Sequence, residues 1–166
     1  MDLKKYRQIK AQMKTGDLLQ WRSHSALGAA IRWRTKSHVN HSSLVIRLAE
    51  YEGLERRRFT TEALSRGIMF NLLSRELARY RGEVWWYPLK ESWNEKRQSI
   101  GEVALSLIGT PYDYKSLFRQ LIGKVSADAR ALFCSEYCFI AYGFTGQAPT
   151  PAEMSSLGIF EPPIKL

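Results

Sequence analysis

The feature that most constrains the fold is a change in the spacing of apolar residues past the middle of the chain. The first part holds short runs rich in β-branched and aromatic residues, which predict strands at 18–21, 42–48, 57–63, 67–73 and 84–89. From Asn94 onward, apolar residues recur at helical spacing, which predicts helices ending near Gly109, at 114–122 and at 132–144. Strands followed by helices are typical of an α+β domain whose central antiparallel sheet packs against helices.

The two ends of the chain are expected to frame a single domain. A length of 166 residues, 45% of them hydrophobic, suits one globular unit spanning 1–166. Residues 1–14 space apolar side chains along one helical face, which predicts an N-terminal helix that either docks on its own domain or lies on a membrane surface. A further helix is expected at 26–34, and the proline-punctuated segment 145–166 is expected to be a surface tail.

The charge of the chain indicates the kind of partner. A formal charge of +9 and an isoelectric point near 9.7 favour anionic surfaces, among them nucleic acid, acidic lipid and acidic envelope polymers. The basic runs 56–58 and 75–81 are compatible with a non-catalytic binding module. Charged runs are usually solvated faces, however, and no nucleic-acid motif is recognised, so nucleic acid is not the expected partner.

Targeting signals are not apparent in the sequence. The N-terminal segment is charged throughout and lacks the apolar stretch of a secretory signal, and no window has the length of a transmembrane segment. We therefore expect a protein that is cytoplasmic as synthesised, with the cell envelope as a possible place of action.

Two cysteines four residues apart in a predicted helix carry the main chemical interest. Neither finds a disulfide partner elsewhere in the chain. Cys134 is predicted at the start of the helix, where unpaired backbone N–H groups and the helix dipole stabilise a thiolate and can serve as oxyanion donors. Cys138, one turn later, is expected in the core. Cys134 is the candidate nucleophile, the alternative being a second buried cysteine.

The histidines, His24, His38 and His41, all lie in the first quarter of the chain. His41 directly precedes a predicted strand that would hold its ring in place, so it is the preferred general base, with His38 left open. A zinc site built from His38, His41 and the two cysteines is the metal alternative. The cysteine spacing matches no common zinc motif, so we expect no metal and no cofactor.

Several short motifs together resemble the circularly permuted branch of the NlpC-type papain-like cysteine amidases, the YiiX-like proteins. The similarity extends from about Thr15 to Phe144, and the histidine segment precedes the cysteine helix, as in that branch. The motifs that carry it are Thr15-Gly16-Asp17-Leu18-Leu19, Ser37-His38-Val39-Asn40-His41-Ser42-Ser43-Leu44-Val45, Gly109-Thr110-Pro111-Tyr112-Asp113-Tyr114 and Phe133-Cys134-Ser135-Glu136.

The resemblance implies a papain-like, permuted NlpC-type domain with its nucleophile on a C-terminal helix. It assigns the nucleophile to Cys134, the base to His41 and the third polar residue to Glu62. A carboxylate in that third place would fix the tautomer of the imidazole and stabilise the imidazolium.

The resemblance also assigns Tyr112 and Ser135 to substrate binding or to the oxyanion site. One departure from the family pattern follows the histidine, where Ser42 and Ser43 replace a valine and a glycine.

The activity implied is cysteine-dependent hydrolysis of an amide bond through a thioester. Peptidoglycan stem peptides with γ-D-glutamyl-type linkages are the first substrate class implied, which would make the protein an endopeptidase or amidase. A lipid acyltransferase or thioesterase on the same fold is the alternative enzyme. The non-catalytic basic binding module is the alternative from another class.

Overall fold

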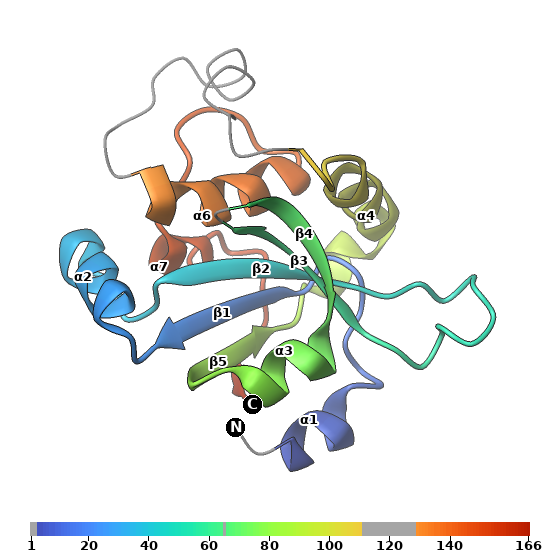
Figure 1. The fold of residues 1–166 in the computed structure, drawn as a ribbon. Helices are drawn as coiled ribbons and strands as arrows, with labels where there is room; N and C mark the ends of the chain where they lie inside the picture. The colour runs from blue at the N-terminus through green and yellow to red at the C-terminus, as the bar shows by residue number, and fades with distance from the viewer. Residues whose placement is uncertain (1–2, 65, 111–128) are drawn as a thin grey trace.

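The computed structural model describes residues 3–64, 66–110 and 129–166 of the chain (Figure 1). Six strands form one antiparallel sheet in the spatial order β4-β3-β2-β1-β5-β6. The prediction of an α+β fold with a central antiparallel sheet is confirmed. The strands are β1 (Leu18–Ser23), β2 (His41–Ile46), β3 (Phe59–Leu64), β4 (Gly67–Leu72), β5 (Gly82–Tyr87) and β6 (Ile164–Lys165).

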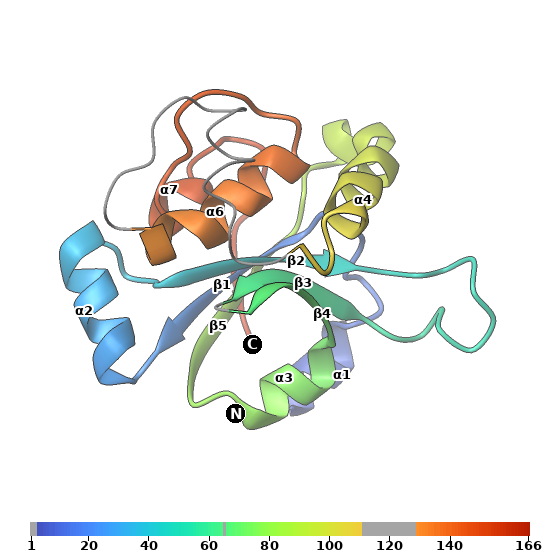
Figure 2. The same ribbon diagram turned by 45° about the horizontal axis from the view of Figure 1, so that its top comes forward.

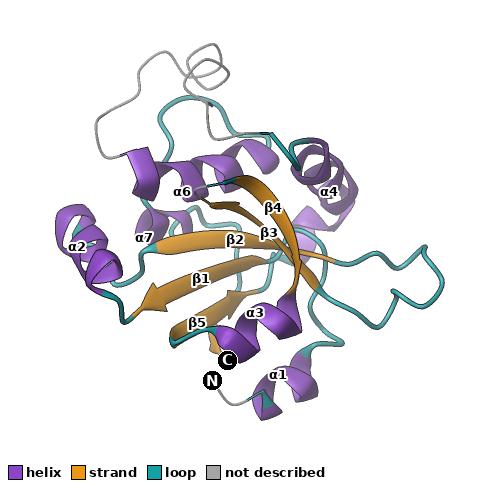
Figure 3. Cartoon of the chain, in the orientation of Figure 1, coloured by secondary structure: helices purple, strands orange, loops and turns teal. Residues whose placement is uncertain are grey.

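Helices cover both faces of this sheet. In Figures 1 and 2, α4, α6 and α7 lie over one face, while α1 and α3 lie under the other. Helix α2 stands beside the sheet, next to the ends of β1 and β2, as Figure 3 also shows. The helices are α1 (Lys4–Ile9), α2 (Ala26–Thr35), α3 (Leu73–Arg79), the 3₁₀ helix η1 (Glu91–Lys96), α4 (Arg97–Ser106), α6 (Ala129–Ala141) and α7 (Pro151–Met154).

Each face of the sheet carries its own apolar core, because successive strand residues point to opposite faces. Leu18 packs with Ile100 of α4 and Tyr137 of α6 in one cluster. Its neighbour Leu19 belongs to the other cluster, together with Leu77 of α3. The alternation of β1 therefore places the α6 layer and the α3 layer on opposite sides of a shared sheet.

Asp17 fixes the entry into β1. It follows Gly16, whose positive φ of 87° makes the turn, and its side chain is almost fully buried. The carboxylate accepts hydrogen bonds from Trp86 Nε1 at 2.9 Å and from the backbone N–H of Leu89 at 3.0 Å. It also pairs with the guanidinium of Arg97 at 2.8 Å. The Gly-Asp motif thus joins β1 to the end of β5 and to α4.

The N-terminal helix is shorter than predicted. It runs from Lys4 to Ile9 instead of filling 1–14. Buried Arg58 donates to the backbone carbonyls of Ala11 and Met13, at 3.1 Å and 2.7 Å. In a helix filling 1–14 these carbonyls would lie in the last turn and lack an intrahelical partner, so the distant guanidinium fixes the segment that follows α1.

The prediction of a surface tail at 145–166 is wrong. Pro151 opens α7, after a capping box between Thr150 and Glu153, and strand β6 pairs with β5. Met154 is fully buried and Phe160 is only 8% exposed. Proline at the first position of a helix starts a helix as readily as it marks a loop, which is why the prolines were misleading.

Two other predicted elements differ in extent or fall outside the described residues. The strand predicted at 67–73 ends at Leu72, and α3 follows it directly. The helix predicted at 114–122 lies outside the described residues. Among the described helices, none has the length and apolar character that crossing a bilayer demands.

Candidate active site

His41 and Glu62 meet on adjacent strands of the sheet. His41 is the first residue of β2, and Glu62 lies in the middle of β3. The Nε2 atom of His41 is 2.8 Å from Oε2 of Glu62, and the two side chains are 16% and 8% exposed. A charge-assisted hydrogen bond of this length in a mostly buried place fixes the orientation of the imidazole.

Asn71 supports Glu62 from the next strand. Its Nδ2 donates to the second carboxylate oxygen of Glu62 at 3.4 Å. Glu62 pairs across the β3–β4 hairpin with Met69, so Asn71 is its diagonal neighbour on the same face of the sheet. Sequence reasoning missed Asn71. An asparagine inside a strand is unusual, and this is a signal that could have been used once the hairpin register was known.

Cys134 approaches His41 from the helical layer that packs on the sheet. It lies on α6, which packs across β2 and β3, and it is fully buried. The side chains of Cys134 and His41 are hydrogen-bonded. Since Nε2 of His41 is bound to Glu62, the nitrogen left for the sulfur is Nδ1. His41 therefore lies between Cys134 and Glu62, and the three residue types can form a nucleophile, a base and an orienting group.

The electrostatics of His41 favour its protonated form. Burial lowers the pKa of the imidazole, but the Cys134 thiolate and the Glu62 carboxylate act in the other direction and raise it to about 10. At neutral pH, the arrangement therefore favours the imidazolium form of His41.

The neighbours of Cys134 on α6 behave differently. Burial, reinforced by nearby Cys134 and Glu62, raises the pKa of the Cys138 thiol well above its usual value, which keeps it protonated. Cys138 belongs to the apolar core, where it was expected. Burial raises the pKa of Glu136 to about 7, so this carboxyl titrates near neutrality two residues from Cys134.

The prediction that Cys134 opens its helix is wrong. Helix α6 already begins at Ala129, which places Cys134 in the second turn. Backbone N–H groups beyond the first turn normally donate to the carbonyl four residues earlier, so those of Cys134 and Ser135 are not the free donors of a helix start. The hydroxyl of Ser135 donates to the carbonyl of Pro149 at 2.6 Å, which ties α6 to the segment before α7. Tyr112 lies outside the described residues.

His38 lies apart from this arrangement. It is exposed, and its ring packs edge-on against Trp85 with 5.8 Å between centroids. Of the two histidines left open by the sequence, the one in contact with Cys134 is His41.

Helix α2 is linked by hydrogen bonds to the segment that precedes His41. Arg32 of α2 donates to the carbonyl of Ser23 at 2.5 Å, and the backbone N–H of Ser23 donates to Asn40 Oδ1 at 2.6 Å. Gly28 permits a close approach, because a Cβ at this position would lie 2.8 Å from Cβ of Ser23. The residue immediately before His41 is thereby fixed to the end of β1.

Unpaired polar atoms lie close to this site in the sheet. Gln20 Oε1, Ser42 Oγ and Thr61 Oγ1 are buried and have no hydrogen-bond partner within the described part of the chain. Gln20 is directly opposite Ser42 in the β1–β2 pair, and Gln20 Nε2 also donates to the carbonyl of Pro151 in α7. Buried polar groups are usually satisfied, so these three are suited to receive a water molecule or a substrate group.

The fold is similar to that of a solved structure described as the metalloprotein YiiX from Escherichia coli O157:H7. The TM-score is 0.58 and the sequence identity is 22%, over 79% of this chain and 65% of the other. This chain therefore matches less than two thirds of that protein, and the likeness shows a YiiX-like fold. No family model and no curated protein matches the sequence.

The donor groups of the described residues do not fit a metal centre of the usual kind. A structural or catalytic metal needs at least three protein ligands in most sites of this type. Within residues 3–64, 66–110 and 129–166, no group of three His, Cys, Asp or Glu side chains converges in this way. Nε2 of His41 is already bound to Glu62, and His38 lies at Trp85.

Proposed function

We propose that the protein is a cysteine hydrolase of the permuted NlpC-type, papain-like class, with Cys134 as nucleophile, His41 as acid and base, and Glu62 as orienting carboxylate. The observation that carries the proposal is the position of His41, which is hydrogen-bonded to Glu62 through Nε2 at 2.8 Å and also to the Cys134 side chain. The pKa of His41, raised to about 10, supports a charged dyad.

The proposed reaction begins with attack of the Cys134 thiolate on an amide carbonyl. The C–N bond breaks as His41 transfers its proton to the leaving amine, and the acyl group remains on sulfur as a thioester. Neutral His41 then takes a proton from water, whose oxygen attacks the thioester. The carboxylic acid leaves, and the proton retained by His41 restores the charged dyad. Glu62 holds the ring in the same orientation throughout.

Two features of the site set requirements for this reaction. The sulfur of Cys134 is fully covered, so substrate entry requires a displacement of the atoms that cover it. Because Cys134 does not open its helix, oxyanion donors must come from elsewhere. Tyr112 keeps its proposed role, and the unpaired hydroxyl of Ser42, which follows the base directly, is a further proposed donor.

For the substrate, we propose an amide bond of a peptidoglycan stem peptide. The family resemblance suggests this class, and a net charge of +9 suits an anionic envelope polymer.

A specific feature of α2 favours acyl lipids as a second substrate class. Trp33 is 82% exposed, and Ala26, Ala29 and Ala30 on the same helix are also exposed. The sequence contains five Lys and Arg residues and no acidic residue between Asp17 and Glu50. An exposed apolar helix face among cations suits an anionic lipid surface, and α2 is fixed to the residue before His41.

The experiment that tests the enzyme is product analysis by mass spectrometry. Purified protein is incubated with muropeptides and, separately, with vesicles that contain acyl-ester phospholipids, and Cys134→Ala is the matched inactive variant. We expect cleavage by the wild type and none by Cys134→Ala. Cys138→Ala removes the same sulfur atom one turn away and should retain activity. Equal product formation by all three proteins would disprove the assignment.

A further inference from the structure

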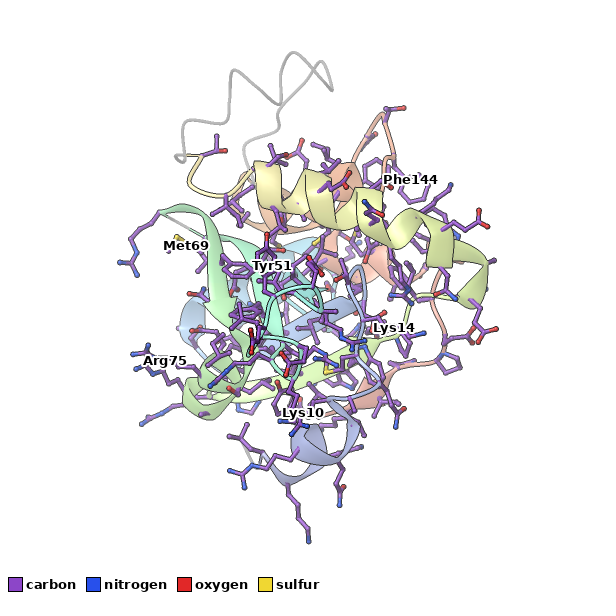
Figure 4. All side chains as sticks on the ribbon, turned by 90° about the vertical axis from the view of Figure 1, so that its right-hand side faces the viewer. Lys10, Lys14, Tyr51, Met69, Arg75 and Phe144 are labelled. Carbon is purple, nitrogen blue, oxygen red and sulfur yellow. The ribbon has the colours of Figure 1, made fainter. Side chains whose placement is uncertain are left out.

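A pocket lies on the α1 and α3 side of the sheet. Its volume is about 400 Å³. Figure 4 views the molecule from the side on which the β2–β3 loop projects in Figure 1, and Lys10 is labelled there below Tyr51. The walls come from α1, the β2–β3 loop and the junction of β4 with α3, and the lining residues used below are Tyr6, Lys10, Glu55, Arg56, Arg57, Arg58 and Leu72.

This pocket is separate from the candidate active site. Arg58 precedes β3, and Glu62 lies four residues further along the chain, which at strand spacing is a separation of roughly 13 Å. The active site uses the starting end of β2, whereas the pocket is formed by the loop that follows the other end of that strand.

Cations dominate the lining. Lys10, Arg56, Arg57 and Arg58 face a single carboxylate, that of Glu55. The ion pairs found in the described part of the chain involve Glu83, Glu62 and Asp17, and none of them includes a residue of this pocket. The positive charge of the pocket is therefore not neutralised by a salt bridge in that part of the protein.

Arg58 is the fixed member of this group. It is only 3% exposed, and its guanidinium donates to the carbonyls of Met13, Ala11, Glu55 and Arg57. Carbonyl oxygens hold the guanidinium in place without cancelling its charge. Arg58 thus supplies a rigid positive centre, while exposed Arg56 and Arg57 supply adjustable ones.

Glu55 brings a negative charge into the same lining. Its Oε2 atom is buried and has no hydrogen-bond partner within the described residues. This atom is covered by protein, so a ligand in the pocket would meet the other atoms of the Glu55 side chain, which lines it. The pocket therefore offers several cations for an anion, beside a carboxylate side chain that suits a neighbouring donor group.

We infer that this pocket binds a phosphate monoester or diester that carries a hydroxyl or ammonium group beside the phosphate. Arginine side chains match phosphate oxygens through paired hydrogen bonds. The volume exceeds that of a bare phosphate, and Tyr6 and Leu72 provide walls for an organic portion. Both a soluble phosphate ester and a phospholipid headgroup have this chemistry.

Isothermal titration of the full chain with three probes tests this inference. The probes are inorganic phosphate, glycerol phosphate and ethanolamine phosphate. We expect saturable binding that is tighter for the two esters than for inorganic phosphate. Arg57→Gln should weaken ester binding about tenfold, in line with the loss of a charge-assisted hydrogen bond. Arg66→Gln is the matched control, because Arg66 is an exposed cation near the opposite end of β3, and it should leave binding unchanged.

Further arms identify the source of the ligand and separate it from catalysis. Glu55→Gln should reduce the advantage of ethanolamine phosphate over inorganic phosphate. Flotation with phosphatidylglycerol vesicles, lost in Arg57→Gln and kept in Arg66→Gln, would indicate a lipid headgroup; ester binding without flotation would indicate a soluble ligand. Cys134→Ala should bind the esters like the wild type. The inference is overturned if no probe binds saturably, or if Arg57→Gln and Arg66→Gln weaken binding equally.

Discussion

Nε2 of His41 lies 2.8 Å from Oε2 of Glu62, and this contact decides which ring nitrogen is available to the sulfur of Cys134. With Nε2 occupied, only Nδ1 is left for Cys134. The orientation of the ring is therefore imposed by β3, and a change at Glu62 is expected to act on the chemistry at Cys134 without touching it.

The first prediction concerns the reactivity of the two thiols. Iodoacetamide at pH 6 to 7 should modify Cys134 faster than Cys138, because Cys134 is hydrogen-bonded to His41 as the proposed dyad requires, whereas burial raises the pKa of Cys138. His41→Ala should slow Cys134 alkylation at pH 6 by about tenfold or more, since an unassisted thiol has a pKa of about 8.5. Peptide mapping by mass spectrometry measures both rates, with His38→Ala as the control that should change neither. Equal alkylation rates of the two cysteines, with the rate at Cys134 unchanged in His41→Ala, would contradict the dyad.

The second prediction concerns pH dependence. The pKa of His41 is raised to about 10, so the imidazolium that would protonate the leaving group in the proposed reaction is present below that value and is lost as pH rises through it. Glu62→Gln removes one of the charges that raise this pKa. The alkaline limb of kcat/KM should therefore move to lower pH, and the rate at neutral pH should fall about tenfold or more. An unchanged pH profile would contradict the role of Glu62.

The third prediction concerns Asn71. Asn71→Ala removes the donor to Oε1 of Glu62. It should reduce kcat about threefold to tenfold with little change in KM, because the Glu62 carboxylate is held less firmly while the contacts to substrate are unchanged. Asn71→Asp tests the charge instead, since a second carboxylate beside Glu62 repels it and should also reduce kcat. Steady-state kinetics on both variants measure this. A change confined to KM would place Asn71 in substrate binding instead.

The fourth prediction concerns stability. Asp17→Ala leaves Arg97 without its carboxylate and leaves Trp86 Nε1 without its acceptor. Loss of one member of a buried ion pair costs about 3 to 5 kcal/mol, so the free energy of unfolding should fall by that amount. Urea denaturation measures it. Glu83→Gln, which affects only the more exposed pairs with Arg22 and Lys165, should change stability little.

The fifth prediction concerns the exposed face of α2. If acyl lipids are the substrate, Trp33→Ala should weaken sedimentation with anionic vesicles and lower activity on vesicle-bound ester about tenfold, while activity on a soluble thioester stays the same. Tyr51→Ala is the control, because Tyr51 is 57% exposed on the β2–β3 loop. Equal effects of both substitutions would remove the case for α2 as a lipid-binding surface.

Local patterns predicted much of the fold. The β-branched and aromatic runs correspond to β1 to β5, because each strand has at least one buried face and its apolar residues are therefore required by packing. The prediction was wrong where distant groups decide the structure. Arg58 fixes the segment after α1 through the carbonyls of Ala11 and Met13, and no local pattern near residue 11 contains that information.

For the candidate site too, local sequence patterns were informative and distant contacts were not predictable. Residue type and the order of the motifs selected Cys134, His41 and Glu62, and the structure brings these three side chains together. Asn71 was missed because its role depends on the register of the β3–β4 hairpin. The start of α6 was placed too late because residues 129–131 (Ala, Arg, Ala) lack the apolar spacing that marks the rest of the helix.

Strand β6 is only two residues long, yet it covers the strand with the most aromatic residues in the sheet. Without Ile164 and Lys165, the backbone of Trp85 and Trp86 would present unpaired N–H and C=O groups along an open edge. Such an edge is a template for pairing with a second molecule. Clipping or truncation of the last few residues should therefore promote aggregation through β5.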